Sequence, residues 1–154
     1  MGPFLADLER SAEALVQEHG IPLLTDLAGT GMVRMDPSRV RQAVLALVDN
    51  AAKYGPKGER VSLSSATSDG ELRIEVSDRG PGIPEEHLPR VFERFYQVDV
   101  PGEPGSGLGL SVAKSIAEAH GGRIEAERRT GGGTKMSLCL PLLEVSGKED
   151  PAGR

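Results

Sequence analysis

The 154-residue sequence has no tryptophan, only five other aromatic residues and a single cysteine. So few aromatic rings leave little with which to stack nucleic-acid bases, and the net charge of −5 repels a phosphate backbone. We therefore expect no nucleic-acid partner. The lone Cys139 cannot form an internal disulfide, so the sequence favours a reducing compartment and we expect a cytoplasmic location.

Long apolar runs are also missing. A membrane-spanning helix needs about 20 mostly apolar residues, and the runs in this sequence are far shorter. No apolar segment typical of a signal peptide follows the N-terminus. The sequence therefore predicts a domain without direct membrane contact, and it leaves open whether a longer parent protein is membrane-anchored.

Glycine, by contrast, is abundant, with 20 residues. Half of these glycines cluster between segments of regular apolar periodicity: Gly80, Gly82, Gly105, Gly107, Gly109, Gly121, Gly122 and Gly131 to Gly133. Clustering of this kind is typical of loops whose backbone turns sharply or approaches a ligand closely.

The apolar periodicity predicts interleaved helices and strands. In chain order the predicted elements are a helix over 5–16, a strand over 23–27, a helix over 37–53, strands around 61–63 and 72–76, a helix over 110–120, and strands over 124–126 and 136–140. Asp36 followed by Pro37 is typical of an N-cap and a first helical residue. Gly121 stands where a left-handed C-cap is expected.

Hairpin signals dominate the connections between the predicted strands, at Ser68 to Gly70 and at Thr130 to Gly133. We therefore predict an α+β fold, a two-layer α/β sandwich with a mixed, mostly antiparallel sheet and helices on one face. Residues 1–145 form the predicted domain. The polar residues 146–154 are expected to be a disordered tail.

Three segments carry residues suited to chemistry, and the first is the helix over 37–53. Asn50, the only asparagine, lies there with Lys53 and Tyr54 three and four residues further on, so the three share one helix face. An amide oxygen is a hard ligand suited to Mg²⁺, a lysine can neutralise phosphate, and a tyrosine ring can cover a base or ribose. The alternative is a solvated helix face with an incidental asparagine.

The second segment runs from Asp78 to Pro84, directly after a predicted strand. Asp78 could accept a hydrogen bond from an exocyclic amine such as adenine N6. Gly80 and Gly82, followed by Ile83, would let the backbone pass close to a flat ring. The alternative is an ordinary Asx-type turn, which Asp-x-Gly forms readily.

The third segment opens the helix over 110–120 with a glycine-rich turn. Free backbone N–H groups and the positive helix end would face an anion there. The residues concerned are Gly105, Gly107, Leu108, Gly109 and Leu110. The spacing of these glycines matches neither the Rossmann fingerprint nor a P-loop. The alternative is an ordinary glycine-rich loop. The preceding residues 100–104 have the composition of a mobile lid.

The order of these motifs resembles the catalytic and ATP-binding domain of sensor histidine kinases. Asn-x-x-Lys-Tyr, Asp-x-Gly-x-Gly, Phe92-x-x-Phe95, Gly-x-Gly-Leu-Gly-Leu and Gly-Gly-Gly-Thr134 look like that family's N, G1, F and G2 boxes and its terminal Gly-x-Gly-Thr. The resemblance covers roughly residues 5–142. It implies the Bergerat ATP-binding fold, with ATP and Mg²⁺ as cofactors.

The resemblance also implies roles for single residues. Asn50 would hold Mg²⁺ and Lys53 would contact phosphate, both as catalytic residues, while Tyr54 would pack near the adenosine. Asp78 would bind adenine N6, helped by Thr134 through a shared water. The turn from Gly105 to Leu110 would donate backbone N–H groups to the phosphates.

Two positions depart from the pattern of that family. Ala46 stands where the family often has a second asparagine, and where related ATPases have a general-base glutamate, so vigorous ATP hydrolysis is not expected. Gln97 replaces an arginine that can reach the γ-phosphate. These differences favour a second hypothesis, a degenerate nucleotide-binding or docking module without phosphotransfer. An anti-sigma-type serine kinase is a third.

The resemblance further implies partners. None of His19, His87 and His120 has the context of a phosphoacceptor, and we expect all three to be structural or surface residues, His87 in a proline-flanked loop. The acceptor histidine is therefore expected on a separate dimerisation domain of the same kinase, which would serve a response regulator in turn. The isolated domain is expected to be a monomer.

Overall fold

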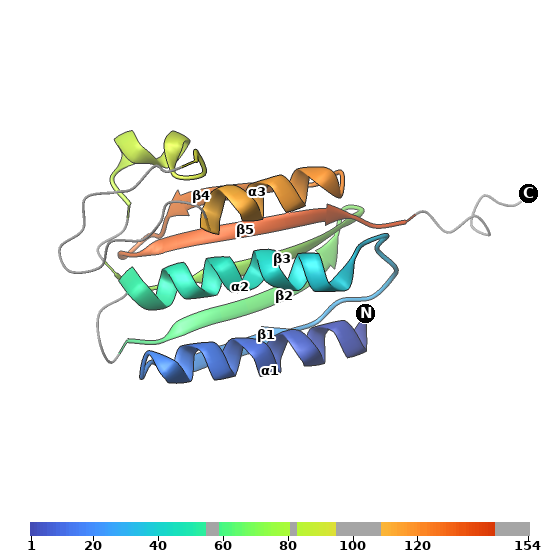
Figure 1. The fold of residues 1–154 in the computed structure, drawn as a ribbon, viewed down its shortest axis with the longest axis horizontal. Helices are drawn as coiled ribbons and strands as arrows, with labels where there is room; N and C mark the ends of the chain where they lie inside the picture. Colours follow the sequence, from blue (N-terminus) through green and yellow to red (C-terminus); the bar gives the residue numbers. More distant parts are fainter. Residues whose placement is uncertain (55–58, 81–82, 95–108, 144–154) are drawn as a thin grey trace, which may run out of the picture.

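A computed structural model describes residues 1–54, 59–80, 83–94 and 109–143. Within these ranges the elements alternate between helices and strands (Figure 1). In chain order they are α1 (Gly2–Glu18), β1 (Leu23–Leu27), α2 (Pro37–Tyr54), β2 (Val61–Ser68), β3 (Glu71–Ser77), the 3₁₀ helix η1 (Glu85–Arg90), α3 (Gly109–Ala119), β4 (Arg123–Arg128) and β5 (Thr134–Pro141).

The five strands form one sheet in the order β1-β2-β3-β5-β4. β1 runs parallel to β2, across the connection that contains α2, and every other pair is antiparallel. Asp69 and Gly70 both have positive φ values, as the tight β2–β3 hairpin requires. The predicted fold class, a mixed and mostly antiparallel sheet, is confirmed.

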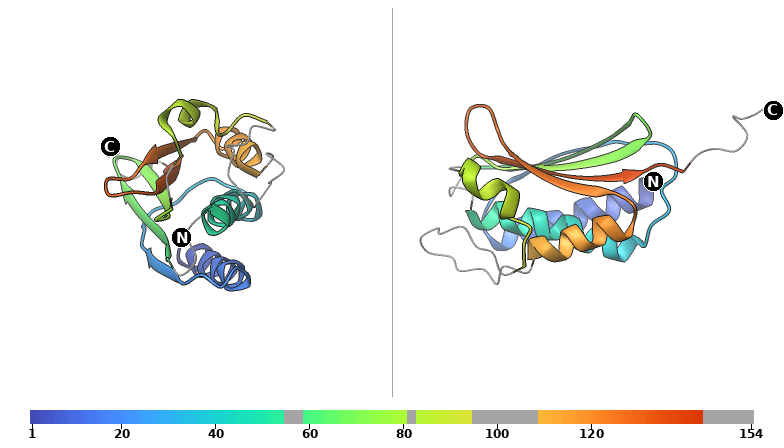
Figure 2. Two further views of the ribbon diagram at one scale, coloured as in Figure 1. Left: turned by 90° about the vertical axis from the view of Figure 1, so that its left-hand side faces the viewer. Right: turned by 90° about the horizontal axis from the view of Figure 1, so that it is seen from above.

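All three α-helices pack against one face of the sheet, so the molecule has two layers (Figure 2). The core between the layers is aliphatic, because alternate strand residues point toward the helices. Leu8 of α1, Leu47 of α2 and Leu63, Ile74 and Leu138 of the sheet are among its fully buried side chains. Burial on this scale, at about 25 cal/mol per Å² of apolar surface, is the main source of stability.

The ends of α2 and α3 are joined by polar contacts. The Asp36 carboxylate caps α2 by accepting hydrogen bonds from the backbone N–H groups of Ser38 and Arg39, at 3.1 and 3.3 Å. The Asp36 N–H in turn donates to Nε2 of His120, at 3.0 Å, while Nδ1 of His120 lies 2.7 Å from the carbonyl oxygen of Ile116. His120 therefore ties the C-terminal end of α3 to the N-terminal end of α2, so it is structural, as expected.

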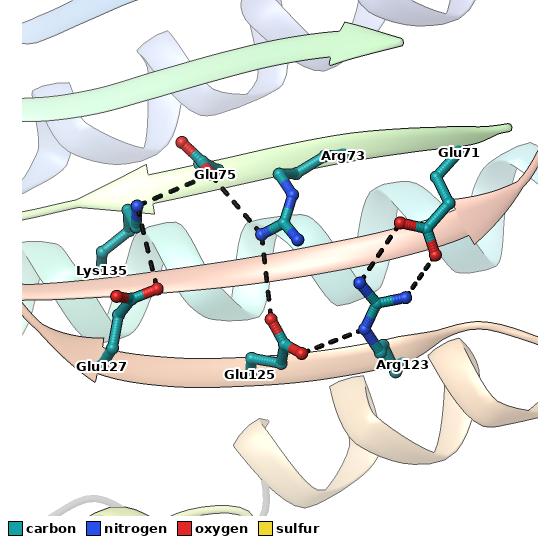
Figure 3. A network of polar contacts seen from close by, with 7 residues as sticks. All are labelled: Glu71, Arg73, Glu75, Arg123, Glu125, Glu127 and Lys135. Atoms are coloured by element: carbon teal, nitrogen blue, oxygen red, sulfur yellow. Dashed lines mark hydrogen bonds and ion pairs between the residues drawn. The ribbon is translucent and has the colours of Figure 1, made fainter. Parts of the chain in front are cut away.

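The other face of the sheet carries a network of ion pairs (Figure 3). It joins alternating acidic and basic side chains of three strands: Glu71, Arg73, Glu75, Arg123, Glu125, Glu127 and Lys135. Cys139 and Ser137 point to the same face from β5 and are almost inaccessible. Burial raises the pKa of the Cys139 thiol, so the sole cysteine is protected from oxidation rather than reactive.

The predicted element boundaries agree with the structure to within a few residues, and Gly121 has the left-handed φ of +76° that its C-cap position requires. One expectation was wrong: His87 lies in η1, not in an irregular loop. The lid over 100–104 and the tail over 146–154 fall outside the described residues. None of the described helices combines the length and apolar character that a membrane crossing requires.

Candidate functional site

Several element ends meet at one end of the molecule. The last turn of α2, the end of β3, the β4–β5 turn and the first residue of α3 all lie on the left in Figure 1. The antiparallel pairing of β3 with β5 accounts for part of this arrangement, since it sets Ser77 opposite Lys135. The arrangement places described residues of the three predicted chemical segments at the same end of the molecule.

The helix segment approaches the glycine segment through Ala46. A Cβ placed on Gly109, the first residue of α3, would lie 3.9 Å from the Ala46 side chain, which makes this an ordinary van der Waals contact. Asn50 follows Ala46 by one helical turn on the same face of α2. Asn50 is half-buried, and its amide forms no hydrogen bond with another described residue.

Lys53 forms an ion pair with a neighbour on α2. Its ammonium group lies 3.2 Å from a carboxylate oxygen of Asp49, whose second oxygen lies 3.3 Å from Nε2 of His19 at the end of α1. Lys53 must therefore exchange or share this partner if it is to contact a phosphate. Tyr54 ends α2, and its side chain is not among those the structure describes.

Asp78 is the buried acidic residue of the site. It follows β3 directly and only 8% of it is exposed. Its Oδ1 accepts a hydrogen bond from the Gly80 N–H at 2.8 Å, and its own N–H donates to the Thr134 carbonyl oxygen at 3.0 Å. Burial raises the pKa of the Asp78 carboxyl, although hydrogen bonds to the backbone of Gly80 and Thr134 and the positive charge of Arg129 partly offset the rise.

Thr134 links the two ends of the Asp78 segment. Its carbonyl oxygen accepts from Asp78, and its hydroxyl accepts a hydrogen bond from the Ile83 N–H at 3.1 Å. The residue is 5% exposed. The hydroxyl therefore orders the loop after Asp78 directly, in addition to the water-mediated role that the resemblance implies.

The β4–β5 turn lies directly against Asp78. Gly131, Gly132 and Gly133 all have positive φ, at +90°, +110° and +95°. A Cβ on Gly133 would lie 1.9 Å from the Asp78 carbonyl oxygen. Only glycine permits both this close approach and this backbone conformation.

The rest of the predicted set cannot be placed. Gly82, Gly105, Gly107 and Leu108 lie outside the described residues, as do Phe95 and Gln97. Gly109 and Leu110 begin α3, and Leu110 packs at the edge of the core. Phe92 packs there too.

The segments described above belong to a part of the chain that matches a known protein family. The model of the histidine kinase-, DNA gyrase B-, and HSP90-like ATPases matches residues 35–144, which is most of the chain. The chain belongs to this ATPase family. The match begins just before α2 and ends after β5, so it includes Asn50, Asp78 and Thr134.

Relatives within the ATPase family are sensor kinases. The chain is 47% identical over 110 residues to the signal transduction histidine-protein kinase AfsQ2 of Streptomyces coelicolor, a match that covers 70% of this chain and 20% of that protein. The chain thus spans about a fifth of the length of this curated relative. The sequence resemblance to the catalytic domain of sensor histidine kinases is confirmed.

Two solved structures, one of them of a sensor histidine kinase, have the same fold. The mycobacterial sensor histidine kinase MprB superposes with a TM-score of 0.78 at 30% identity, over 90% of this chain and 95% of that one. Full-length ShkA in complex with AMPPNP also gives 0.78, at 26% identity, over 94% of this chain and 30% of that one.

Sequence reasoning missed two residues of this ATPase domain. Asp49 was not identified as the partner of Lys53, and Arg129 was not identified as a neighbour of Asp78. The i, i+4 spacing of Asp49 and Lys53 was a readable signal. Arg129 lies 51 residues from Asp78, and nothing local in the sequence marks that contact.

Proposed function

We propose that this domain binds Mg·ATP and transfers the γ-phosphoryl group to a histidine on a separate dimerisation domain of a two-component sensor kinase. The observation that carries the proposal is the buried Asp78 carboxyl, held by Gly80 and Thr134 beside a glycine turn. A buried carboxyl with a raised pKa is costly to a fold. Its presence at an end where three segments meet is explained by a ligand that offers it a hydrogen bond.

Adenine has a suitable donor in its exocyclic N6 amine. In this proposal Asp78 accepts from N6, and Gly80 and Ile83 keep the adjoining backbone close to the purine ring. Thr134 fixes the loop between them through its hydrogen bond with Ile83. The family and the AMPPNP complex of ShkA support an adenine nucleotide as ligand.

The Asn50 side chain fits a magnesium ion that is held mainly by phosphate. Among the described residues no group of three or more His, Cys, Asp or Glu side chains could hold a metal by itself. Mg²⁺ commonly keeps several waters and takes one or two protein ligands beside substrate phosphates. The Asn50 amide would be such a ligand, and the metal would neutralise charge on the phosphates during transfer.

Phosphoryl transfer breaks the bond between the γ-phosphorus and the β-bridging oxygen and forms a phosphorus–nitrogen bond, with ADP as the leaving group. Protein groups contribute mainly by positioning and by electrostatic stabilisation. In this domain Lys53 would release Asp49, bind a phosphate oxygen instead and stabilise the negative charge on the phosphate. His120 cannot be the acceptor because both of its ring nitrogens are already engaged. The proposal places the acceptor on another domain.

A degenerate binding module is the second candidate, and Ala46 favours it. This half-buried residue packs at the start of α3 and carries no group that could polarise a nucleophile. Gln97, which stands in place of an arginine able to reach the γ-phosphate, also favours the degenerate module. The sensor-kinase names of the relatives favour transfer to histidine over the anti-sigma-type serine kinase.

Calorimetric titration of the chain with ADP, with and without Mg²⁺, tests the binding part. Labelled ATP mixed with the chain and the acceptor domain of its parent tests the transfer. We expect Mg²⁺-dependent binding and an acid-labile, base-stable phosphohistidine on the acceptor. Binding without any label would favour the degenerate module, label on serine would favour the serine kinase, and no binding would contradict the proposal altogether.

A further inference from the structure

The side chain of Arg129 reaches from the β4–β5 turn to the Asp78 segment. Its Nη1 donates a hydrogen bond to the Asp78 carbonyl oxygen at 3.1 Å. The backbone of Arg129 is held as well, because its N–H donates to the Gly133 carbonyl oxygen at 2.9 Å and its own carbonyl oxygen accepts from Gly132 at 3.1 Å. The half-buried guanidinium is thus fixed next to Asp78 by the same turn that packs on it.

Arg129 is also the cation whose charge acts on the Asp78 carboxyl. It forms no ion pair with any carboxylate in the described part of the chain. Other charges near this end have partners of their own: Lys135 of β5 pairs with Glu75 and Glu127, and Asp49 pairs with Lys53 on α2. Arg79, next to Asp78 in the chain, is exposed. Within the described residues, no carboxylate therefore neutralises the charge of Arg129 through an ion pair.

The protonation state of Asp78 decides which purine the site accepts. An ionised carboxyl can only accept hydrogen bonds, so it suits the N6 amine of adenine and repels the O6 oxygen of guanine. A protonated carboxyl can donate to that oxygen instead. Burial favours the protonated form of Asp78, and the nearby guanidinium opposes it.

We propose that Arg129 is a positioning residue for purine recognition, which keeps Asp78 a hydrogen-bond acceptor and thereby favours adenine over guanine. The inference rests on the proposed function, since it assumes that the purine edge meets Asp78. In this proposal Arg129 acts through Asp78 and not by binding the nucleotide directly.

The test compares Arg129→Gln with Arg128→Gln in the full chain. Gln removes the charge of Arg129 but keeps an N–H donor for the Asp78 carbonyl. Arg128 is the matched control, because it precedes Arg129, has the same charge and is exposed at the end of β4. Affinities for ADP and GDP are measured by calorimetry from about pH 5 to pH 8, above the ordinary Asp pKa of about 3.9. The ADP-to-GDP affinity ratio cancels protonation of the diphosphate, which both ligands share.

Loss of a nearby cation raises the pKa of a carboxyl, so ADP affinity should fall at a higher pH in Arg129→Gln than in the wild type as the solution is acidified. A higher pKa increases the protonated fraction of the carboxyl at a given pH. We therefore expect Arg129→Gln to lose its ADP-over-GDP preference at a higher pH than the wild type does. Arg128→Gln should follow the wild-type profile, and Arg129→Lys, which keeps the charge, should restore most of it.

Thermal unfolding at each pH shows whether the variants are folded. If Arg129→Gln melts below the titration temperature, all variants are titrated at a temperature below its melting point: a preference lost in Arg129→Gln and kept in Arg129→Lys supports the inference, and an equal loss in both overturns it. Equal profiles for Arg129→Gln and Arg128→Gln would also overturn it. Failure of the wild-type chain to bind ADP would instead contradict the proposed function.

Discussion

Gly133 offers the sharpest test of how the turn supports Asp78. In Gly133→Ala the added Cβ would lie 1.9 Å from the Asp78 carbonyl oxygen and 2.8 Å from its carbonyl carbon. Real Cβ contacts are never so short, and both neighbours are backbone atoms, so the turn or the Asp78 segment must move. The residue would also be held at a φ of +95°, which L side chains rarely adopt.

Gly131→Ala separates the two costs. Gly131 belongs to the same turn and has a φ of +90°, but an added Cβ there would meet no atom within 4 Å. The unfavourable backbone conformation should destabilise both variants by about 1–2 kcal/mol. Overpacking should add about 1–3 kcal/mol in Gly133→Ala alone. For a chain of this length that difference corresponds to roughly 2–12 °C in the unfolding temperature.

Thermal unfolding by circular dichroism measures the difference, and ADP titration of the two folded variants shows its effect on the site. We expect Gly133→Ala to melt lower than Gly131→Ala and to bind ADP more weakly, because the displaced backbone is that of Asp78. Equal unfolding temperatures and equal ADP affinities would refute the close packing of the turn on Asp78.

Three further outcomes are expected. Asn50→Ala should lose the Mg²⁺-dependent part of ADP affinity in calorimetry without a lower unfolding temperature, since alanine favours a helix; unchanged Mg²⁺ dependence would remove the assigned role. His120→Ala should lose two hydrogen bonds, about 1–3 kcal/mol or roughly 2–12 °C, whereas His19→Ala, which loses a half-exposed ion pair, should cost at most about 1 kcal/mol; equal losses would contradict this. The raised pKa of Asp78 means that the folded state holds its proton more tightly than the unfolded state does. The free energy of unfolding of the wild type, relative to that of Asp78→Asn, should therefore fall as pH rises from the ordinary Asp pKa through the raised pKa of the folded state. Urea unfolding measures this difference, and a relative free energy that rises with pH would contradict the prediction.

The fold was largely readable from the sequence because its signals are local. The cap at Asp36 and Pro37, the turn at Asp69 and Gly70 and the left-handed Gly121 each depend on neighbours within a few residues. Apolar alternation then fixed which strand face meets the helices. The 3₁₀ helix around His87 was missed because Pro84 precedes it and Pro89 lies inside it, and prolines on this spacing are equally typical of a loop.

The site was readable only in part, since its contacts join distant segments. Asn50 and Asp78 were identified by residue type and by their resemblance to family motifs. The contact of Arg129 with Asp78 spans 51 residues, and it depends on the register of β4 on β5, which single-sequence patterns do not determine. The pairing of Lys53 with Asp49 is different in kind, because it joins an acidic and a basic residue four positions apart on one helix and its signal is therefore local.

The two sides of the proposed site differ in how much the fold alone determines them. On the purine side, Asp78 and Ile83 are joined to Thr134, and Asp78 to Gly80 and Arg129, by hydrogen bonds of 2.8 to 3.1 Å. On the phosphate side, the Asn50 amide has no partner among the described residues, and Lys53 is held by Asp49. The proposed acceptor for adenine is thus preorganised, whereas the proposed groups for metal and phosphate would gain or exchange partners on binding. Preorganisation reduces the cost of binding, so the base should contribute to affinity without Mg²⁺, and the metal should add the part that depends on Asn50.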